Sequence, residues 1–346
     1  VPAVIVGTVD LIGSRLLGRG YGVSRGRRPI EAALMGLDTL FVLDESHLCA
    51  QFVKTLEVLD SQAGAEDRLG GAVPGRATVV MTATPLDGGA VMDWDVEIAA
   101  QAGVAERRRR RRATAVTVEA VGSSTGDAAM KQVLRTISVE PGESTIVFFN
   151  TPGSATAAAK QLAGTKDTAG NPIEVVSLIG GMPSLFREQV TSSLDRIRTG
   201  ASRATVDEPG LVVCATQTLE VGADLDADHL VTPAASVEAL TQRVGRVNRV
   251  GARDGGSVRI IVGGSDKEPV YGPAAAHLGQ ALQEHSPATL GELLDQLAHP
   301  EPEWRMPASE NAVLPRHVAA AYVRTAGSPY EPPVARWLRP PADPRA

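Results

Sequence analysis

The sequence predicts an α/β protein built on parallel sheets, and three observations support that prediction. Short runs rich in β-branched residues alternate with helical stretches along the chain. The runs are apolar almost throughout, which is typical of strands that are buried on both faces of a sheet. The chain has 346 residues, enough for two domains that each bury a core of their own.

Nine β-branched apolar runs are the expected strands, and helices are expected between them. The strands are predicted at residues 3–7, 39–43, 77–82, 115–121, 144–149, 174–178, 210–214, 230–232 and 257–262. The clearest helical stretches are 130–138, 154–163 and 184–198. Because strands alternate with helices, the connections suit parallel pairing with helices on both faces.

The alternation breaks once, between residues 85 and 113, and we place the domain boundary there. The predicted organisation is a first domain at 1–88, a linker at 89–112, a second domain at 113–265 and an accessory segment at 266–346. The linker ends in six arginines, Arg107 to Arg112, which are either a solvated helix end or a patch that contacts phosphates. The accessory segment holds 13 of the 23 prolines, which argues against another sheet layer.

Composition narrows the class of protein. Hydrophobic residues make up 43% and charged residues 21% of the chain, as in ordinary globular proteins. The net charge is -6, so any contact with nucleic acid must be local. Cys49 and Cys214 lie in or beside apolar runs, which suits buried thiols in a reducing compartment. No run approaches membrane-spanning length and no signal peptide opens the chain, so we expect a cytoplasmic protein that begins, at Val1, as a piece of a longer one.

Two adjacent carboxylates follow one of the predicted strands. In the stretch FVLDESHLC, Asp44 and Glu45 stand just past the apolar run. Ligands of doubly wound sheets bind beyond the carboxyl ends of the strands, where a nucleotide would lie. One carboxylate there suits a hydrated Mg²⁺ and the other suits the activation of an attacking water. The alternative is a strand end that carries a helix-capping Asp-Glu pair.

Three further stretches carry polar residues after predicted strands. MTATP, at 81–85, supplies two hydroxyls, and CATQTLEVGADLDAD, at 214–228, supplies Gly222 for close backbone approach and Asp224 within reach of a ribose. A plain turn is the alternative for both. QRVGRVNR, at 242–249, places Arg246 and Arg249 three apart, on one face of a predicted helix. Two such guanidinium groups suit a triphosphate, and a surface arginine helix is the alternative.

Taken in order, these stretches resemble motifs II to VI of a superfamily 2 helicase of the DExH type. The order is DESH, TATP, the strand end at Asn150 and Thr151, TQTLEVGAD and QRVGRVNR. The wording at 4–22 (VIVGTVDLIGSRLLGRGYG) and at 177–189 (SLIGGMPSLFREQ) is similar to the CRISPR-associated helicase-nuclease of type I systems, closest to the I-U or I-G branch. The resemblance extends over residues 4–262 and implies two RecA-like domains, the first of them incomplete.

The resemblance implies ATP and Mg²⁺ as cofactors and a role for each matching residue. Asp44 would bind Mg²⁺ through water, and Glu45 would be the hydrolytic base. His47 would couple the nucleotide site to the second domain through Gln242. The hydroxyls that would link hydrolysis to strand movement are those of Thr82 and Thr84.

The second domain would complete the nucleotide site. Gly222 and Asp224 would approach the nucleotide, and Arg246 and Arg249 would act as arginine fingers that meet Asp44 and Glu45 across a cleft. The positions that match contacts to the phosphates of single-stranded DNA are Thr8, Thr151 and Thr216. Aromatic residues make up only 3% of the chain, which agrees with backbone tracking rather than base stacking.

Two parts of the family pattern are missing from the sequence. No G-x-x-x-x-G-K-[ST] is present, so the lysine that reaches the β- and γ-phosphates is absent. The histidines include no His-Asp pair, so the metal-dependent nuclease centre is absent too. We expect an internal fragment, with the phosphate loop before Val1 and the nuclease beyond Ala346.

The leading hypothesis is an ATP-driven 3′-to-5′ translocase of single-stranded DNA in type I CRISPR interference, with a crRNA-guided effector complex as its partner. One alternative is a DExH helicase of DNA repair or RNA processing, which the sequence of residues 4–22 disfavours. The other is a nucleic-acid-binding module that does not hydrolyse ATP. A GKT or GKS upstream of Val1 would decide between hydrolysis and binding alone.

Overall fold

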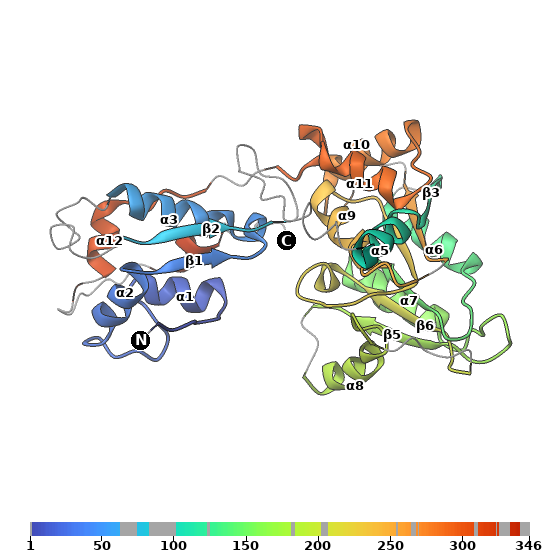
Figure 1. Ribbon diagram of the computed structural model, residues 1–346, viewed down its shortest axis with the longest axis horizontal. Helices are drawn as coiled ribbons and strands as arrows, with labels where there is room; N and C mark the ends of the chain where they lie inside the picture. The colour runs from blue at the N-terminus through green and yellow to red at the C-terminus, as the bar shows by residue number, and fades with distance from the viewer. Residues whose placement is uncertain are drawn as a thin grey trace. The chain divides into compact units, whose positions relative to one another are not determined.

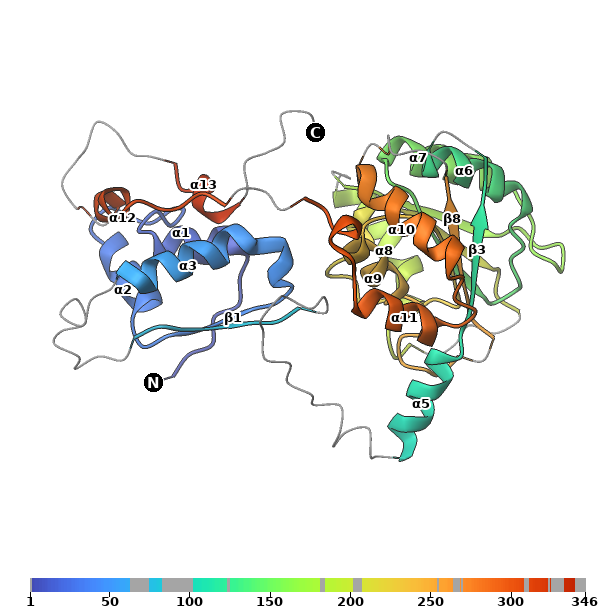
Figure 2. The same cartoon turned by 90° about the horizontal axis from the view of Figure 1, so that it is seen from above.

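The computed structural model divides the chain into two compact units (Figure 1, Figure 2). The first unit combines residues 1–89 with 307–346, and the second comprises 90–306. The structure describes residues 2–62, 75–82, 102–122, 125–180, 184–201, 207–253, 255–263, 268, 270–307, 311–322, 324 and 333–339. Within these ranges no helix is long and apolar enough to cross a membrane.

The first unit contains a parallel pair of strands among short helices. In chain order the described elements are α1 (Val9–Leu16), α2 (Arg28–Gly36), β1 (Leu40–Leu43), η1 (Ser46–Cys49), α3 (Ala50–Gln62), β2 (Ala77–Val80), α12 (Arg316–Tyr322) and α13 (Ala335–Leu338). The strands pair in register, with Leu40 opposite Ala77 and Leu43 opposite Val80. The sheet of this unit is therefore parallel, as the sequence predicts.

The strand predicted at residues 3–7 is wrong. These residues have no regular structure, and Val4 is 93% exposed. A β-branched run forms a strand only where a neighbour supplies hydrogen bonds and a surface to pack on. Thr8, which follows, is the N-cap of α1, and its Oγ1 accepts a hydrogen bond of 3.3 Å from the Leu11 backbone nitrogen.

The end of the chain is part of the core of the first unit. Leu314, Tyr322 and Trp337 are buried in one cluster with Phe52 and Leu56 of α3. In Figure 2 the red helices α12 and α13 lie beside the blue helices α1 to α3. The segment 266–346 is thus not a single accessory element, because its last part completes the first unit.

Specific hydrogen bonds join α3 to this terminal segment. The Gln51 side chain donates to the Ala312 carbonyl at 2.9 Å and accepts from the Ala312 backbone nitrogen at 2.7 Å. Thr55 Oγ1 donates to the Trp337 carbonyl at 2.6 Å, and Trp337 Nε1 donates to the Tyr322 hydroxyl at 2.8 Å. Gln51 and Thr55 are buried polar side chains that find their partners in backbone groups of the terminal segment, so this segment is an integral part of the first unit.

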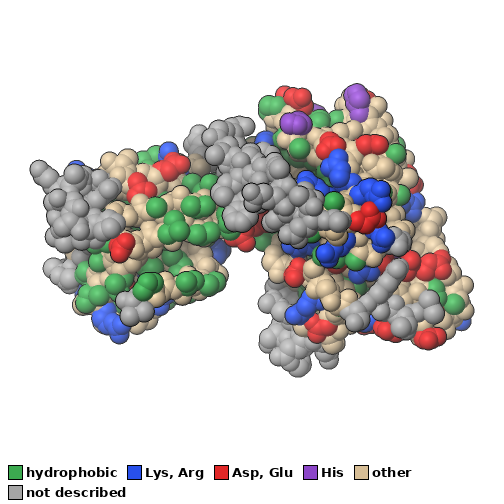
Figure 3. Space-filling view, viewed as in Figure 1, with side chains coloured by type: hydrophobic (Ala, Val, Ile, Leu, Met, Phe, Trp, Pro, Cys, Tyr) green, Lys and Arg blue, Asp and Glu red, His purple; other side chains and the backbone are tan. Residues whose placement is uncertain are grey.

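One face of the strand pair remains exposed. Along β1, Phe41 and Leu43 are buried, whereas Leu40 is 60% and Val42 is 53% exposed. Val79 of β2 is also exposed. Figure 3 shows hydrophobic side chains gathered on the surface of this unit. Within the described residues, this exposed apolar area contributes no hydrophobic free energy to folding.

The second unit contains a six-stranded parallel sheet. In chain order its elements are α5 (Ala102–Arg112), β3 (Ala115–Ala120), α6 (Gly126–Val133), η3 (Leu134–Thr136), β4 (Ser144–Phe148), α7 (Pro152–Leu162), β5 (Glu174–Leu178), α8 (Ser184–Asp195), β6 (Leu211–Ala215), η4 (Gln217–Leu219), β7 (His229–Pro233), α9 (Val237–Val244), β8 (Ser257–Val262), α10 (Gly272–Glu284), α11 (Leu290–Ala298) and η5 (Pro302–Trp304). The strand order is β3-β8-β7-β4-β6-β5, and every pair is parallel. The α/β prediction with parallel sheets is confirmed.

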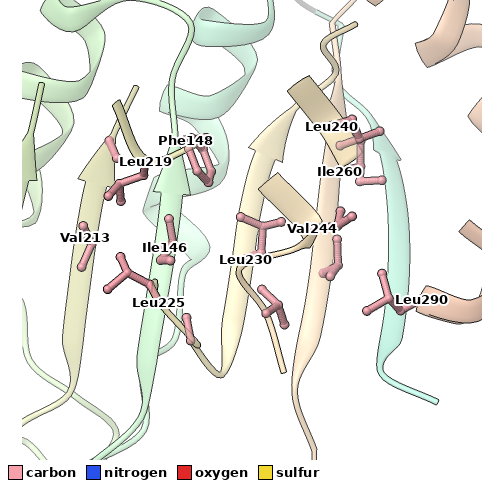
Figure 4. Close-up of a cluster of buried hydrophobic side chains, with 14 of the residues drawn as sticks. Ile146, Phe148, Val213, Leu219, Leu225, Leu230, Leu240, Val244, Ile260 and Leu290 are labelled. Atoms are coloured by element: carbon pink, nitrogen blue, oxygen red, sulfur yellow. The ribbon is translucent and has the colours of Figure 1, made fainter. Parts of the chain in front are cut away.

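The alternation of side chains along each strand divides the core of the second unit into two layers. In β4, Ile146 and Phe148 point to the layer covered by α9, α10 and α11, which Figure 4 shows in part. Val147 lies in the other layer, together with side chains of α6 and α7. Both faces of the strand are therefore buried, which is why the run is apolar at every position.

The arginine run is a helix that belongs to the second unit. Residues 102–112 form α5, which packs against α11 and leads directly into β3. The helices α10 and α11, from the proline-rich part of the chain, cover the sheet, with Leu278 and Leu293 fully buried. Residues 90–306 form one unit, so α5, predicted within a linker at 89–112, and α10 and α11, predicted beyond a domain end at 265, belong to the second unit.

Candidate functional site

The DESH stretch forms a tight turn at the end of β1. Glu45 takes left-handed backbone angles, with φ at 49°. The Met81 backbone nitrogen donates to the Leu43 carbonyl at 2.8 Å, and the Ser46 nitrogen donates to the Met81 carbonyl at 3.0 Å. The turn is thereby fixed to the chain that leaves the neighbouring strand β2. A non-glycine residue held in this conformation marks a position that its surroundings determine strongly.

His47 connects the DESH and TATP stretches within the first unit. Its Nδ1 lies 3.1 Å from Thr82 Oγ1 and 3.4 Å from Glu45 Oε2. The histidine therefore holds the carboxylate and the threonine side by side at the carboxyl end of the strand pair. Thr84, the second hydroxyl of the TATP stretch, lies outside the described residues.

Asp44 is the exposed member of the carboxylate pair. Its Oδ1 accepts a 3.0 Å hydrogen bond from the Glu45 backbone nitrogen, and the side chain faces solvent. One exposed carboxylate fits Mg²⁺, which is usually held by one or two carboxylates together with waters and substrate phosphates. No cluster of three or more His, Cys, Asp and Glu side chains suited to a metal ion occurs in the ranges that the structure describes.

In the second unit, the predicted DNA contacts lie at the carboxyl ends of β4 and β6. Thr151 is the N-cap of α7, and its Oγ1 donates to Asp127 Oδ2 at 2.7 Å. Thr216 begins η4 and is only 2% exposed. Thr151 is thus half-exposed at the carboxyl end of β4, whereas Thr216 is buried at the carboxyl end of β6.

The loop after η4 contains Gly222, for which the sequence predicts close backbone approach to a nucleotide, and that approach stays a prediction. Gly222 has φ at 74°, and an added Cβ would meet nothing within 4 Å, so the requirement for glycine is conformational. Asp224 is exposed and forms an ion pair of 3.2 Å with Arg249 Nη1. The Arg249 side chain is itself 42% exposed. This pair is an accessible cation next to an accessible carboxylate.

Arg246 and Arg249 do not share a helix face, which corrects the prediction. Helix α9 ends at Val244, and both arginines lie in the turn that follows. Arg246 is 7% exposed, and its guanidinium donates to three carbonyls of the η4 loop, those of Leu219, Glu220 and Ala223. The two guanidinium groups therefore have different surroundings: one holds the loop and the other faces solvent.

Sequence reasoning missed a buried arginine that organises this region. Arg243 is fully buried. Its Nε lies 2.8 Å from Glu220 Oε1, and its other nitrogens donate to the Thr232 hydroxyl at 3.0 Å and to Asn150 Oδ1 at 3.1 Å. The same guanidinium lies over the Phe148 ring, 5.0 Å from its centroid. One side chain thus joins the ends of β4 and β7 to the η4 loop.

Tyr271 of the α10 entry closes this network. Its hydroxyl donates to Glu220 Oε1 at 3.1 Å and accepts from Arg243 Nη2 at 3.1 Å. Burial raises the pKa of Tyr271 to about 12, so the phenol stays protonated and remains a donor. Glu268 extends the network by accepting from Asn150 Nδ2 at 2.8 Å. Asn150 was recognised only as a strand end, and nothing local in the sequence identifies Tyr271 or Glu268 as its neighbours.

Gln242 lies beside Arg243 in α9 and is also buried, with 8% exposure. Most of α9 is buried, and Leu240 and Val244 lie in the core on the same helix as these polar residues. Polar residues in a buried helix turn could have indicated this network, because buried polar groups need hydrogen-bond partners. The proposed link between Gln242 and His47 concerns two different units and stays a prediction.

Residues 141–252 match a protein-family model described as CRISPR-associated nuclease/helicase Cas3, C-terminal. The match begins before β4 and ends after the turn that holds Arg246 and Arg249. Over these residues the second unit is similar to the C-terminal part of that family. None of the curated proteins matches the chain.

Solved structures of Cas3 proteins resemble the chain. A crystal structure of T. fusca Cas3 shares 18% identity at a TM-score of 0.50, over 78% of this chain and 38% of its own. The T. fusca Cas3-AMPPNP structure shares 17% identity at a TM-score of 0.48, over 74% and 34%. A CRISPR RNA-guided surveillance complex, pre-nicking, shares 15% identity at a TM-score of 0.49, over 84% and 42%. The chain spans between 34% and 42% of the length of these three structures. The likeness to the T. fusca Cas3 structure with a TM-score of 0.50 shows a common fold.

Proposed function

We propose that this chain, whose second unit is similar to the C-terminal part of the Cas3 family, is the motor part of an ATP-dependent helicase that translocates on single-stranded DNA in CRISPR interference. The observation that carries the proposal is the match of residues 141–252, which includes both arginines of the QRVGRVNR stretch. The DESH turn joined to Thr82 through His47 supports it independently, since it lies in the other unit.

In the proposed reaction, the first unit supplies the groups that handle the attacking water. Glu45 is held by its strained backbone and by His47, so its carboxylate has a fixed direction in which to accept a proton. Asp44 faces solvent and would hold Mg²⁺ through water. Bound with ATP, the ion would neutralise phosphate charge. Thr82 would link hydrolysis at the carboxylates to movement of the DNA strand.

In the second unit, Arg249 is the better candidate for an arginine finger. Its guanidinium is exposed and bound only to the exposed Asp224 among the contacts that the structure gives it, so an incoming phosphate can replace that carboxylate. Arg246 would have to leave three carbonyls before it could bind a phosphate. We therefore assign Arg246 the role of holding the loop that carries Gly222 and Asp224.

The proposed polymer is single-stranded DNA, and the proposed partner is a crRNA-guided effector complex. Thr8 and Thr151, exposed and half-exposed, are suited to hydrogen bonds with phosphate oxygens. Thr216 would have to become accessible for the same role. The partner follows from the Cas3-like domain, because a motor of this kind would act where an RNA-guided complex has opened DNA.

A nucleic-acid-binding module without hydrolysis is the second candidate function for this chain. The sequence holds no G-x-x-x-x-G-K-[ST], so no residue of this chain takes the part of the lysine that contacts the β- and γ-phosphates. A general DExH helicase of repair or RNA processing is less favoured, because the family match over residues 141–252 is to Cas3.

The experiment is ATP turnover by the longest natural protein that contains this chain together with a phosphate loop. Glu45→Gln should keep ATP binding and lose most hydrolysis, because only the base is removed. Binding is followed with a fluorescent ATP analogue and hydrolysis by phosphate release, each with and without single-stranded DNA. Glu57→Gln, an exposed carboxylate of α3, is the matched control. Turnover of Glu45→Gln equal to that of the wild type would end the assignment.

A further inference from the structure

Helix α5 is the most basic element of the second unit, and the proposed function does not use it. Six of its eleven residues are arginines, and Glu106 is its only carboxylate. Arg107, Arg108, Arg109 and Arg110 are exposed. Figure 3 shows basic side chains gathered on the part of this unit where Figure 1 draws α5. The chain as a whole has a net charge of -6, so this is a local concentration.

Two contacts fix α5 to the second unit, so its arginines have a defined place. At Gly251, where φ is 65°, a Cβ would come within 1.8 Å of the Arg107 carbonyl oxygen. The helix backbone therefore lies directly on the turn that follows Arg249. At the C-terminal end of the helix, Arg112 Nη2 donates to Asp295 Oδ2 at 2.6 Å and to the Gly291 carbonyl at 3.3 Å. A helix held at its middle and at its C-terminal end is more than a solvated linker.

Among the described residues, Glu106 and Asp295 form ion pairs with arginines of α5. Glu106 pairs with both Arg109 and Arg110. The half-buried Arg111 has no hydrogen-bond partner for its Nε in the described part of the chain. Its pKa is lowered by burial and by the nearby charge of Arg249. Adjacent like charges in a fixed arrangement favour the binding of an anion that can contact several of them at once.

We propose that the exposed arginines of α5 bind the phosphate backbone of single-stranded nucleic acid. Guanidinium groups form bidentate hydrogen bonds with phosphate, and a row of them along a fixed helix suits an anion that repeats along a strand. No aromatic side chain lies in α5, so the surface offers contacts to phosphates and none for base stacking.

This surface is separate from the strand-end threonines. Thr151 and Thr216 follow the carboxyl ends of β4 and β6, whereas α5 leads into the amino end of β3, the edge strand on the far side of β8 and β7. The inference rests on the proposed function for the presence of a nucleic acid, and it adds a second contact to that function. A single-stranded nucleic acid bound at both surfaces would lie across the second unit.

The test measures binding by the 346-residue chain itself, so it needs no phosphate loop. The triple variant Arg108→Gln, Arg109→Gln, Arg110→Gln removes exposed charges and leaves Arg111 and Arg112 in place. Its matched control is Arg135→Gln, Lys160→Gln, Lys166→Gln, three exposed cations of the same unit. Circular dichroism and thermal melting verify that both variants are folded.

Fluorescence anisotropy follows the binding of labelled oligothymidylate over a series of salt concentrations. Each lost phosphate contact should reduce the slope of log K against log salt by about 0.7, so the α5 variant should lose about 2 in slope and bind roughly tenfold or more weakly at low salt. The control variant should retain the wild-type slope. A wild-type slope in the α5 variant would overturn the proposal that α5 binds nucleic acid, while leaving the proposed function intact. Absence of binding by the wild type would overturn both.

Discussion

At the scale of single residues, Arg243 joins more elements of the second unit than any residue that was selected from the sequence. It is fully buried, it is paired with Glu220, and it donates to groups from β7, from the end of β4 and from Tyr271. A buried ion pair with all of its donors and acceptors satisfied contributes little net attraction, but loss of one member leaves an uncompensated charge. The pair therefore makes the region intolerant of change.

We predict that Arg243→Met destabilises the chain by about 3–5 kcal/mol, because the Glu220 carboxylate keeps its charge and loses its partner. Arg259→Met is the matched control, because Arg259 pairs with Glu119 at 2.7 Å while both side chains are partly exposed. That variant should cost no more than about 1 kcal/mol. Urea unfolding followed by circular dichroism measures both values. Equal losses in the two variants would contradict the role of the buried network.

The two arginines of the turn after α9 should respond differently to substitution. In the parent protein with a phosphate loop, Arg249→Ala should reduce ATP turnover by roughly a thousandfold, as loss of an arginine finger does, with little change in melting temperature. Arg246→Ala should lower the melting temperature as well, because it leaves the carbonyls of Leu219, Glu220 and Ala223 without their guanidinium donor. Unchanged turnover in Arg249→Ala would remove that residue from the reaction.

Prediction from sequence worked at the residue scale where a residue acts alone. Cys49 and Cys214 are buried thiols, as the apolar runs around them predict. It failed where partners are far apart in the chain, because nothing local connects Arg243 with Tyr271 or Asn150. The helical spacing of Arg246 and Arg249 also misled, since α9 ends before them. Asn248, between the two arginines, has a φ of 43°, which is incompatible with a continuing helix.

At the scale of elements, the strands of the second unit were predictable and the outlying helices were not. The strand Ser257–Val262 has the predicted bounds, and the strands at 144 and 174 begin where expected. Strands buried on both faces are apolar throughout, so their composition alone identifies them. Helices α5, α12 and α13 carry little apolar pattern, and their places depend on distant partners such as Gly251 and α3. Such partners are invisible to local patterns.

The docking of α5 makes a prediction about Gly251. Gly251→Ala should be destabilising in two ways: the residue has a positive φ, and its Cβ would overlap the Arg107 carbonyl. Gly255→Ala is the matched control, since Gly255 has φ at 89° but nothing within 4 Å of an added Cβ. The control should lose only the cost of the left-handed conformation, about 1–2 kcal/mol. Thermal melting should give a lower melting temperature for Gly251→Ala, and amides of α5 should exchange faster in that variant. Equal effects would mean that α5 is not docked as described.

At the scale of the whole molecule, the two units differ in how completely their sheets are covered. The second unit buries both faces of a six-stranded sheet, with two hydrophobic layers. The first unit has a pair of strands with Leu40 and Val42 exposed on one face. Its core also depends on residues such as Leu314 and Trp337, which enter from the far end of the chain. Closing a long loop of this kind costs conformational entropy, and the first unit has less buried apolar area to offset that cost.

We therefore predict that residues 1–88 are less stable than residues 113–265. Hydrogen exchange followed by mass spectrometry should show faster exchange in peptides of the first range than in those of the second. Truncation before residue 307 should raise exchange in α3 further, because Gln51 and Thr55 lose the partners described above. Slower exchange in the first range than in the second would contradict this account of the two units.

The central claim is that this chain provides the carboxylates and the arginine finger of an ATP-driven motor but no group that holds the β- and γ-phosphates in line. The measurement is ATP hydrolysis by the purified 346-residue chain at neutral pH with Mg²⁺, with and without single-stranded DNA, beside a longer natural chain that includes a phosphate loop. Positioning accounts for much of phosphoryl-transfer catalysis, so the account predicts negligible turnover by the 346-residue chain and DNA-stimulated turnover by the longer one. DNA-stimulated hydrolysis by the 346-residue chain alone would contradict it, because a phosphate site would then have to exist among these residues.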